Sequence, residues 1–218
     1  MRLLLDNGIT DVVEFGRYWE ETGMKNTPIQ WLVLEETDEY LFLTTKETII
    51  SKFFDKVSSS WIDSDIRRWL NNDFINLAFN EYEKPSIIEK KIDTIFGEDV
   101  MRYKEKFCNN KVVTSEDKLF LLSIEEVEKH FSTQNSRIAE QGKYALNTLE
   151  EDRKFTNSWW LRNSGVGLFG ESPILVLEDG MFYLEAAPLN LEGIRPAMFI
   201  KHNYYEFIPC ENQLTFDL

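Results

Sequence analysis

Short apolar runs separated by turns fill the first part of the chain, a pattern typical of antiparallel strands. Residues 12–15 are mainly apolar and precede Gly16, and residues 29–34 form an almost continuous apolar run rich in β-forming side chains. Two acidic residues at 38–39 separate this run from another over residues 40–44. We expect residues 29–34 and 40–44 to pair as a hairpin.

Helical periodicity follows these strands. The apolar positions within residues 66–70 are spaced three and four apart, and Asp63 or Ser64 is suited to cap a helix that begins there. Apolar residues within 74–78 continue the spacing beyond the polar pair at 71–72. The sequence therefore predicts a helix from residue 66 towards residue 78, either unbroken or interrupted at 71–72.

Two further helices are predicted from their first turns. Pro85 suits the first turn of a helix that would include the isoleucines of residues 87–92. Ser123 and Glu126 have the spacing of a capping box, in which each side chain bonds a free backbone N–H of the first turn. We expect that second helix to run to about Phe131.

The last third of the chain is predicted to be rich in strands. Residues 159–162 and 194–200 each read as one strand. The runs 173–178 and 181–184 flank the Asp-Gly pair at 179–180. An Asp-Gly pair between two such runs predicts a hairpin with a type I′ turn, because that turn needs positive φ at both central residues.

Polar segments lie between these elements. Residues 96–116 are charged and are interpreted as an excursion from the core: a charged helix, a long loop or an insertion. Residues 118–122 read as a buried strand, whereas 132–157 show little periodicity and are expected to be irregular. Neither a repeat nor a linker divides the sequence, so we expect a single domain over residues 1–218, of the α+β class.

The overall charge narrows the classes of partner. The chain has 38 acidic and 24 basic residues, for a net charge of −14. Such a field repels nucleic-acid phosphates and anionic lipids, so we expect neither direct nucleic-acid binding nor membrane association. The charge is that of a well solvated surface, or else of an acidic face for a basic protein partner.

The ends of the chain and its cysteines predict a cytoplasmic location. Cys108 and Cys210 are far apart and neither belongs to a C-x-x-C pair, so no disulfide scaffold is implied. The apolar run within residues 1–6 is too short for a signal peptide, and no run approaches the ~20 residues of a membrane span.

No coherent metal or catalytic set is recognisable. His130 and His202 are the only histidines, and Glu126 with His130 lacks the second histidine of a zincin helix. Residues 63–65 (Asp-Ser-Asp) read as a helix cap, and the glycine-rich residues 165–170 lead to a strand, so a flexible connector is expected there. We expect no metal and no cofactor.

Two motifs of the last third carry a family resemblance. Residues 159–165 read Trp-Trp-Leu-Arg-Asn-Ser-Gly, and residues 193–197 read Gly-Ile-Arg-Pro-Ala. The chain resembles an uncharacterised bacterial domain family whose members typically show Trp-Trp-Leu-Arg-Ser-Pro-Gly followed by Gly-Val-Arg-Pro-Ala. The departure is Asn163-Ser164 in place of Ser-Pro. The other matching segments, in the same order, are residues 15–18, 28–34, 64–71 and 117–123.

The resemblance implies a fold. The carboxy-terminal strands and Arg-Pro ending of that family are similar to those of C-type-lectin-like and formylglycine-generating-enzyme-like domains. A C-type-lectin-like α+β fold is therefore expected, with mostly antiparallel sheets and two to four helices. Formylglycine-generating enzymes use a cysteine pair that neither Cys108 nor Cys210 matches, so that oxidase activity is not carried over. The calcium-binding tripeptides of sugar-binding lectins are also missing.

Strand geometry separates the signature into two sides. Trp159 and Leu161 would point one way, and Trp160 and Arg162 the other. One tryptophan could enter the core while the other stacks near a guanidinium, and Arg195 could play the same part as Arg162. The arginines either tie loops to the sheet or contact a ligand carboxylate, phosphate or sugar.

Three hypotheses of function follow. The first is a non-enzymatic recognition module that binds a protein or small ligand through residues 132–157 and 163–172, beside the tryptophan–arginine strand. The second is an enzyme of unknown reaction, and the third is an acidic inhibitor or adaptor of a basic protein. The candidate ligand-binding residues are Trp160, Arg162, Arg195, Asp65 and Arg67, and the enzyme would use the last four of them.

Overall fold

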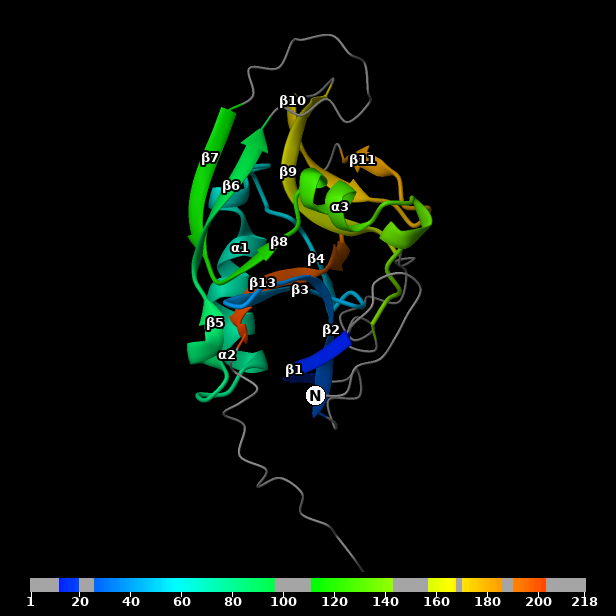
Figure 1. Ribbon diagram of the computed structural model, residues 1–218. Helices are drawn as coiled ribbons and strands as arrows, with labels where there is room; N and C mark the ends of the chain where they lie inside the picture. The colour runs from blue at the N-terminus through cyan, green and yellow to red at the C-terminus, as the bar shows by residue number, and fades with distance from the viewer. Residues whose placement is uncertain are drawn as a thin grey trace, which may run out of the picture.

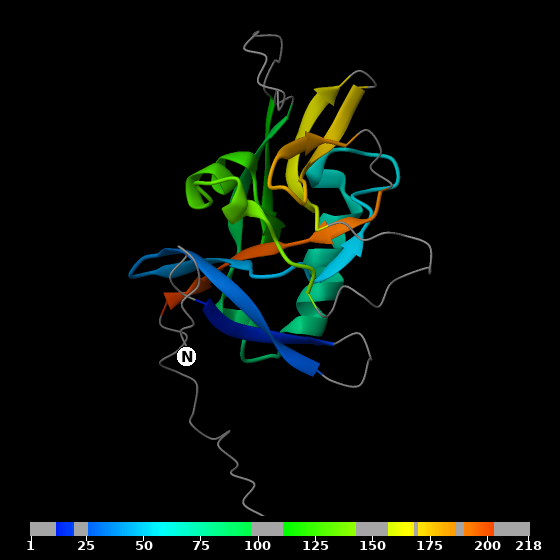
Figure 2. The same cartoon turned by 90° about the vertical axis from the view of Figure 1, so that its right-hand side faces the viewer.

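Two mostly antiparallel sheets and a few short helices make up the fold (Figure 1). In both views the strand pairs β6–β7 and β9–β10 extend towards the same end of the molecule (Figure 2). One continuous hydrophobic cluster draws residues from both sheets and includes four fully buried tryptophans. The computed structural model describes residues 12–19, 26–96, 111–142, 157–167, 170–185 and 190–202.

The first sheet has the strand order β1-β2-β3-β13-β5, and β8 also pairs with β13. The β2–β3 hairpin confirms the prediction for residues 29–34 and 40–44. The Thr37 hydroxyl accepts the backbone N–H of Tyr40 at 3.1 Å, which fixes the turn between these strands. The bounds are β1 Val12–Trp19, β2 Asn26–Glu36, β3 Tyr40–Thr45, β5 Ile87–Ile88, β8 Leu119–Leu121 and β13 Pro196–Lys201.

The second sheet has the order β11-β10-β9-β12-β4, and β9 also pairs with β6, the partner of β7. The strand predicted at residues 159–162 is the start of the longer β9. The bounds are β4 Ile50–Lys52, β6 Lys90–Phe96, β7 Lys111–Asp117, β9 Trp159–Gly167, β10 Gly170–Val176, β11 Phe182–Leu184 and β12 Glu192–Ile194.

The helix predicted from residue 66 is present and runs without interruption to residue 78. It consists of α1 (Asp65–Trp69), a π-helical turn η2 (Leu70–Phe74) and α2 (Ile75–Ala78), and it follows a short 3₁₀ turn, η1 (Trp61–Asp63). Ser64 is the N-cap, because its hydroxyl accepts the Arg67 backbone N–H at 3.1 Å. Because residues 71–72 lie in the π-helical turn, the helix widens there and does not break.

The capping box predicted at Ser123 and Glu126 is confirmed. It begins α3 (Ile124–His130), and both reciprocal hydrogen bonds of the box are present, at 3.2 and 2.9 Å. Phe131 follows the last helical residue as the C-cap. Further along, the 3₁₀ turn η4 (Asn135–Arg137) lies within the segment expected to be irregular.

The helix predicted after Pro85 is wrong. Pro85 belongs to the 3₁₀ turn η3 (Lys84–Ser86), and the isoleucines that follow lie in β5 and β6. Isoleucine is stiff at χ1 and packs well on a pleated surface, so sheet packing outweighs the helical spacing of these residues. Ile87, for example, pairs with Ile200 on β13 and is 4% exposed.

The charged segment 96–116 is partly a strand. Residues 111–116 belong to β7, which pairs with β6 from Phe96↔Lys111 to Lys90↔Asp117. Alternate residues of β7 are exposed, which explains why the sequence looked like an excursion from the core. Residues 97–110 of that segment, with Cys108, lie outside the described residues.

The hairpin predicted around Asp179-Gly180 is present, but its turn is longer than predicted. The Gly180 N–H donates to the Leu177 carbonyl and the Leu177 N–H to the Met181 carbonyl, both at 2.8 Å. Residues 178–180 thus form a three-residue loop, with Gly180 at φ 83°. A glycine with positive φ at the last loop position is typical of a turn followed by a bulge.

Candidate functional site

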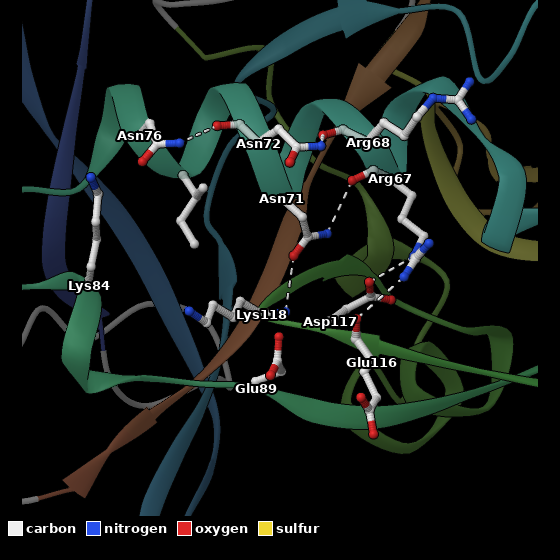
Figure 3. Close-up of a pocket in the computed structure, with 11 residues that line it drawn as sticks. Arg67, Arg68, Asn71, Asn72, Asn76, Lys84, Glu89, Glu116, Asp117 and Lys118 are labelled. Atoms are coloured by element: carbon white, nitrogen blue, oxygen red, sulfur yellow. Dashed lines mark hydrogen bonds and ion pairs between the residues drawn. The ribbon is translucent and has the colours of Figure 1, made fainter.

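A polar pocket of about 420 Å³ opens between the 65–78 helix and the turn that joins β7 to β8 (Figure 3). One wall is the helix, and the others come from the 3₁₀ turn η3, the β5–β6 junction and the end of β7. The lining side chains are almost all polar or charged, and Ile75 is the apolar exception. They are Arg67, Arg68, Asn71, Asn72, Ile75, Asn76, Lys84, Glu89, Glu116, Asp117 and Lys118.

A buried ion pair fixes one end of the pocket. Arg67 Nε donates to Asp117 Oδ1 at 2.7 Å, and the Asp117 side chain is fully buried. The other carboxylate oxygen of Asp117 accepts the Trp61 indole N–H at 3.1 Å and the Ser115 hydroxyl at 2.6 Å. Because every oxygen of this carboxylate is engaged, helix α1, η1 and β7 hold one another in place.

Asn71 fixes the middle of the pocket. Its amide nitrogen donates to the carbonyls of Arg67 and Leu119, at 3.1 and 2.8 Å. Its amide oxygen accepts the backbone N–H groups of Lys118 and Leu119, at 3.0 and 3.1 Å. The side chain thereby makes all four hydrogen bonds that an amide offers, and it ties the π-helical turn to the start of β8.

Other side chains of the pocket have polar or charged groups that no described residue binds. Asn72 and Asn76 each donate one N–H to the carbonyl four residues earlier, at 2.8 and 2.6 Å. No hydrogen bond to their amide oxygens occurs within the described residues. Lys118 and Glu89 likewise make no ion pair with any described residue, and Figure 3 shows both across the pocket from the helix.

Asp65 lies at the start of α1 and joins an acidic cluster outside the pocket. Its carboxylate pairs with Arg68, which also lies 3.5 Å from Asp55. Burial raises the pKa of Asp55, but hydrogen bonds from the backbone N–H groups of Val57, Ser58 and Asp65, together with Arg68, outweigh it, so the pKa lies below its ordinary value. This cluster fastens the loop before the helix to its first turn.

Arg162 is buried and bound within the protein. Its Nη1 and Nη2 donate to the two carboxylate oxygens of Glu126, at 2.5 and 3.0 Å, and Nη1 also donates to the Leu121 carbonyl at 2.8 Å. Nε and Nη2 reach the Asp93 carbonyl at 3.3 and 3.2 Å. Glu126 is the capping-box residue of α3, so Arg162 connects that helix to β6, β8 and β9.

Arg195, at the junction of β12 and β13, is 1% exposed. Its guanidinium lies 5.0 Å from the ring centroids of both Phe131 and Trp159, and Nε donates to the Thr45 carbonyl at 2.7 Å. Nη1 has no hydrogen-bond partner among the described residues, and burial lowers the pKa of the side chain to about 9. Aromatic faces, rather than a carboxylate, hold this charge in the core.

The tryptophans of the signature are both fully buried, and one of them lies near a guanidinium as expected, although that guanidinium belongs to Arg195 and not to Arg162. Trp159 lies beside Arg195, while Trp160 packs edge-on against Phe54 and donates to the Lys52 carbonyl at 3.0 Å. The guanidinium of Arg162 instead lies over the ring of Phe120, with Cζ 5.6 Å from the ring centroid. The bulky indoles fill the core on both faces of β9, which leaves neither free to stack at the surface.

The five residues named from the sequence thus occupy separate places. Arg67 lines the pocket, and Asp65 lies beside it on the same helix. Trp160, Arg162 and Arg195 are enclosed in the core. The asparagines at 71, 72 and 76 were missed; their spacing of four and five along one predicted helix was the available signal. Lys118 and Glu89 join them only through the packing of β5–β8.

The remaining candidates from the sequence have ordinary surroundings. His130 packs edge-on against Phe42, and burial lowers its pKa, whereas His202 lies 2.8 Å from Glu36. Residues 165–167 pair with 170–172 across two strands, so no helix begins at this glycine-rich segment. Within the described ranges, no cluster of three or more His, Cys, Asp or Glu side chains is arranged to hold a metal. Cys210 lies outside those ranges.

Fold and site together define a mostly antiparallel α+β domain with a polar pocket. The sequence model of a family described as a domain of unknown function, DUF6273, matches residues 31–202, and the chain belongs to this family. Comparison with curated proteins and with solved structures gives no match. None of the helices in the described part of the chain has the length and apolar character needed to cross a membrane.

Proposed function

We propose that this domain is a non-enzymatic recognition module that binds its ligand in the pocket beside the 65–78 helix. The observation that carries the proposal is that some side chains of the pocket are bonded within the protein while others are left unpaired. The side chains of Arg67, Asn71 and Asp117 are engaged in internal bonds, whereas the charged groups of Lys118 and Glu89 pair with no described residue. We therefore propose recognition at this pocket, in place of the loops beside β9 that the sequence suggested.

Rigidity supports a binding role for this pocket. A site whose walls are already fixed loses little conformational entropy when a ligand enters, so more of the interaction energy appears as affinity. The π-helical turn η2, which presents Asn71 and Asn72, adds to the case, because such turns within α-helices are frequent at functional sites.

A fragment screen by ¹H–¹⁵N NMR tests the proposal. We expect polar fragments to shift the backbone amides of residues 67–76 and 116–118. Lys118→Ala should weaken these hits, while Lys56→Ala, at an exposed position that does not line the pocket, should leave them unchanged. Hits that map to another surface would refute the pocket as the recognition site.

The same protein should be assayed for turnover. An enzyme built on Asp65, Arg67, Arg162 and Arg195 is the alternative, although each of these four side chains is held by a different partner. Turnover that is abolished by Arg67→Lys in a folded variant would replace the recognition module with this enzyme.

A second candidate function is an acidic adaptor for a basic protein, which the net charge of −14 favours. Its binding should weaken steeply with salt, because exposed charges are screened within about 10 Å at 0.1 M ionic strength. Pull-down of a basic partner that survives high salt would argue against this candidate.

A relationship to C-type-lectin-like domains is part of the proposal. It is supported by the antiparallel pairs β9–β10 and β10–β11 and by the Arg195-Pro196 pair at the junction of β12 and β13. Superposition of an experimental structure on such domains tests it, and a different strand order would refute it. We propose the bacterial cytoplasm as the compartment, since the chain has only two cysteines.

A further inference from the structure

We infer that the pocket binds a short peptide with both termini free, whose carboxylate meets Lys118 and whose ammonium group meets Glu89. This inference rests on the proposed function and adds the chemical class of the ligand. It depends on the charges that remain after internal pairing, on the two asparagine amides of the helix wall, and on the charge of the whole chain.

Internal pairing removes most of the charge that lines the pocket. Arg67 and Asp117 neutralise each other, and Arg68 is paired with Asp65 and Asp55 outside the pocket. Lys84 lies 2.8 Å from Glu81. Lys118 and the carboxylates of Glu89 and Glu116 are left, one cation and two anions, and Glu89 is the anion to which we assign the ammonium group. Glu116 engages Arg67 only through its carbonyl oxygen.

A ligand with a single charge suits this pocket poorly. An anion would satisfy Lys118 but cover Glu89, and a cation would do the reverse. Covering a charge without a partner is costly, so the pocket selects against both. A zwitterion pairs both groups. Its zero net charge also avoids the long-range repulsion that the net charge of −14 imposes on anions.

The helix wall favours a peptide over a single amino acid. Asn72 and Asn76 are four residues apart, which places their side chains about 5–6 Å apart on one face of a helix. Their amide oxygens accept hydrogen bonds. In an extended chain that rises about 3.4 Å per residue, N–H groups two residues apart point the same way at a similar spacing. Each amide oxygen can therefore accept one peptide N–H.

The size of the pocket sets the length of the peptide. A volume of about 420 Å³ lies towards the lower end of the range for small-molecule sites, about 300–1,000 Å³. A few glycine-sized residues match this space, whereas a long folded segment does not. Oligoglycines are the plainest probes, because they carry the two charged termini and the backbone without side chains.

In the test, the full chain is titrated with glycine, diglycine, triglycine and tetraglycine, and binding is detected by ¹H–¹⁵N NMR. The best-binding length is then repeated with its amino end acetylated or its carboxyl end amidated. We expect each blocked peptide to bind about tenfold more weakly, in line with the loss of one charged hydrogen bond. Shifts should appear at residues 67–76 and 116–118.

Two neutral variants assign each terminus to its partner. Lys118→Gln should abolish the preference for a free carboxylate while keeping the preference for a free amine, and Glu89→Gln should do the opposite. Neither side chain has a partner among the described residues, so both variants should fold. Lys56→Gln and Glu178→Gln, at exposed positions that do not line the pocket, should retain both preferences.

Three outcomes would contradict the inference that the pocket binds a peptide with free termini. Blocked and free peptides of equal affinity would overturn it, as would the absence of binding by any oligoglycine. In either case the recognition module still stands if polar fragments bind in the pocket, and it falls separately if they do not. Loss of both preferences in either single variant would also contradict the assignment of one terminus to each residue.

Discussion

Arg162 of the signature motif was a candidate for ligand binding, and in the structure its side chain is paired within the protein. Arg162 makes two hydrogen bonds to Glu126, and its side chain is 5% exposed. Arg162→Ala would leave that carboxylate partly buried without its cation. We expect a loss of about 3 kcal/mol in the free energy of unfolding, measured by urea denaturation.

Arg68→Ala provides the matched control for that loss. The Arg68 side chain is 55% exposed, and its pair with Asp65 is at the surface; Asp55, 3.5 Å away and 8% exposed, keeps its hydrogen bonds from three backbone N–H groups without Arg68. Removal of a surface pair should cost less than about 1 kcal/mol. If the two variants lost equal stability, the claim that Arg162 anchors α3 would fail.

Asp55 gives the domain an acid-sensitive contact. Its folded pKa is lower than the unfolded value of about 3.9, so its contribution to stability is complete above that value and disappears as pH falls through the folded pKa. Asp55→Asn should therefore be less stable than the wild type at neutral pH. The difference should shrink in acid, as thermal unfolding across a pH series can show. A constant difference would mean that the lost hydrogen bonds, not the charge, matter.

At the scale of elements, substitutions at two glycines with positive φ distinguish the cost of backbone strain from the cost of a steric clash. Gly170 has φ 104° and open space where a Cβ would lie, whereas a Cβ on Gly180 would overlap the Gln134 carbonyl oxygen. Gly170→Ala should cost about 1–3 kcal/mol from strain alone. Gly180→Ala should cost more, because the β10–β11 loop must also move away from η4. Chemical denaturation of the two variants measures both, and the reverse order would contradict this account of the loop.

Elements with local signals were predictable from the sequence. The capping box of α3 and the β2–β3 hairpin depend on residues a few positions apart, and both are confirmed. The strand after Pro85 was not predictable in this way, because Ile87 and Ile88 lie in a strand through pairing with β13, more than a hundred residues later. Tertiary pairing of this kind overrides helical spacing.

The candidate site was less predictable than the fold for the same reason. Arg67 was named from its helix, but the pocket also needs Lys118 and Glu89, which come from two other parts of the chain. Asn71 looked like a helix break, and its function depends on backbone groups of Leu119 that only the folded chain brings within 3.1 Å.

At the scale of the whole molecule, the net charge of −14 should limit stability through self-repulsion. Raising NaCl from about 0.01 to about 0.1 M shortens the screening length from about 30 Å to about 10 Å, so the midpoint of thermal unfolding should rise at neutral pH. The same addition near pH 5 should have a smaller effect, because the isoelectric point is about 4.7 and most of the net charge is gone. Calorimetry at both pH values supplies the comparison. A salt effect of equal size at both would show that ion binding, not relief of repulsion, stabilises the fold.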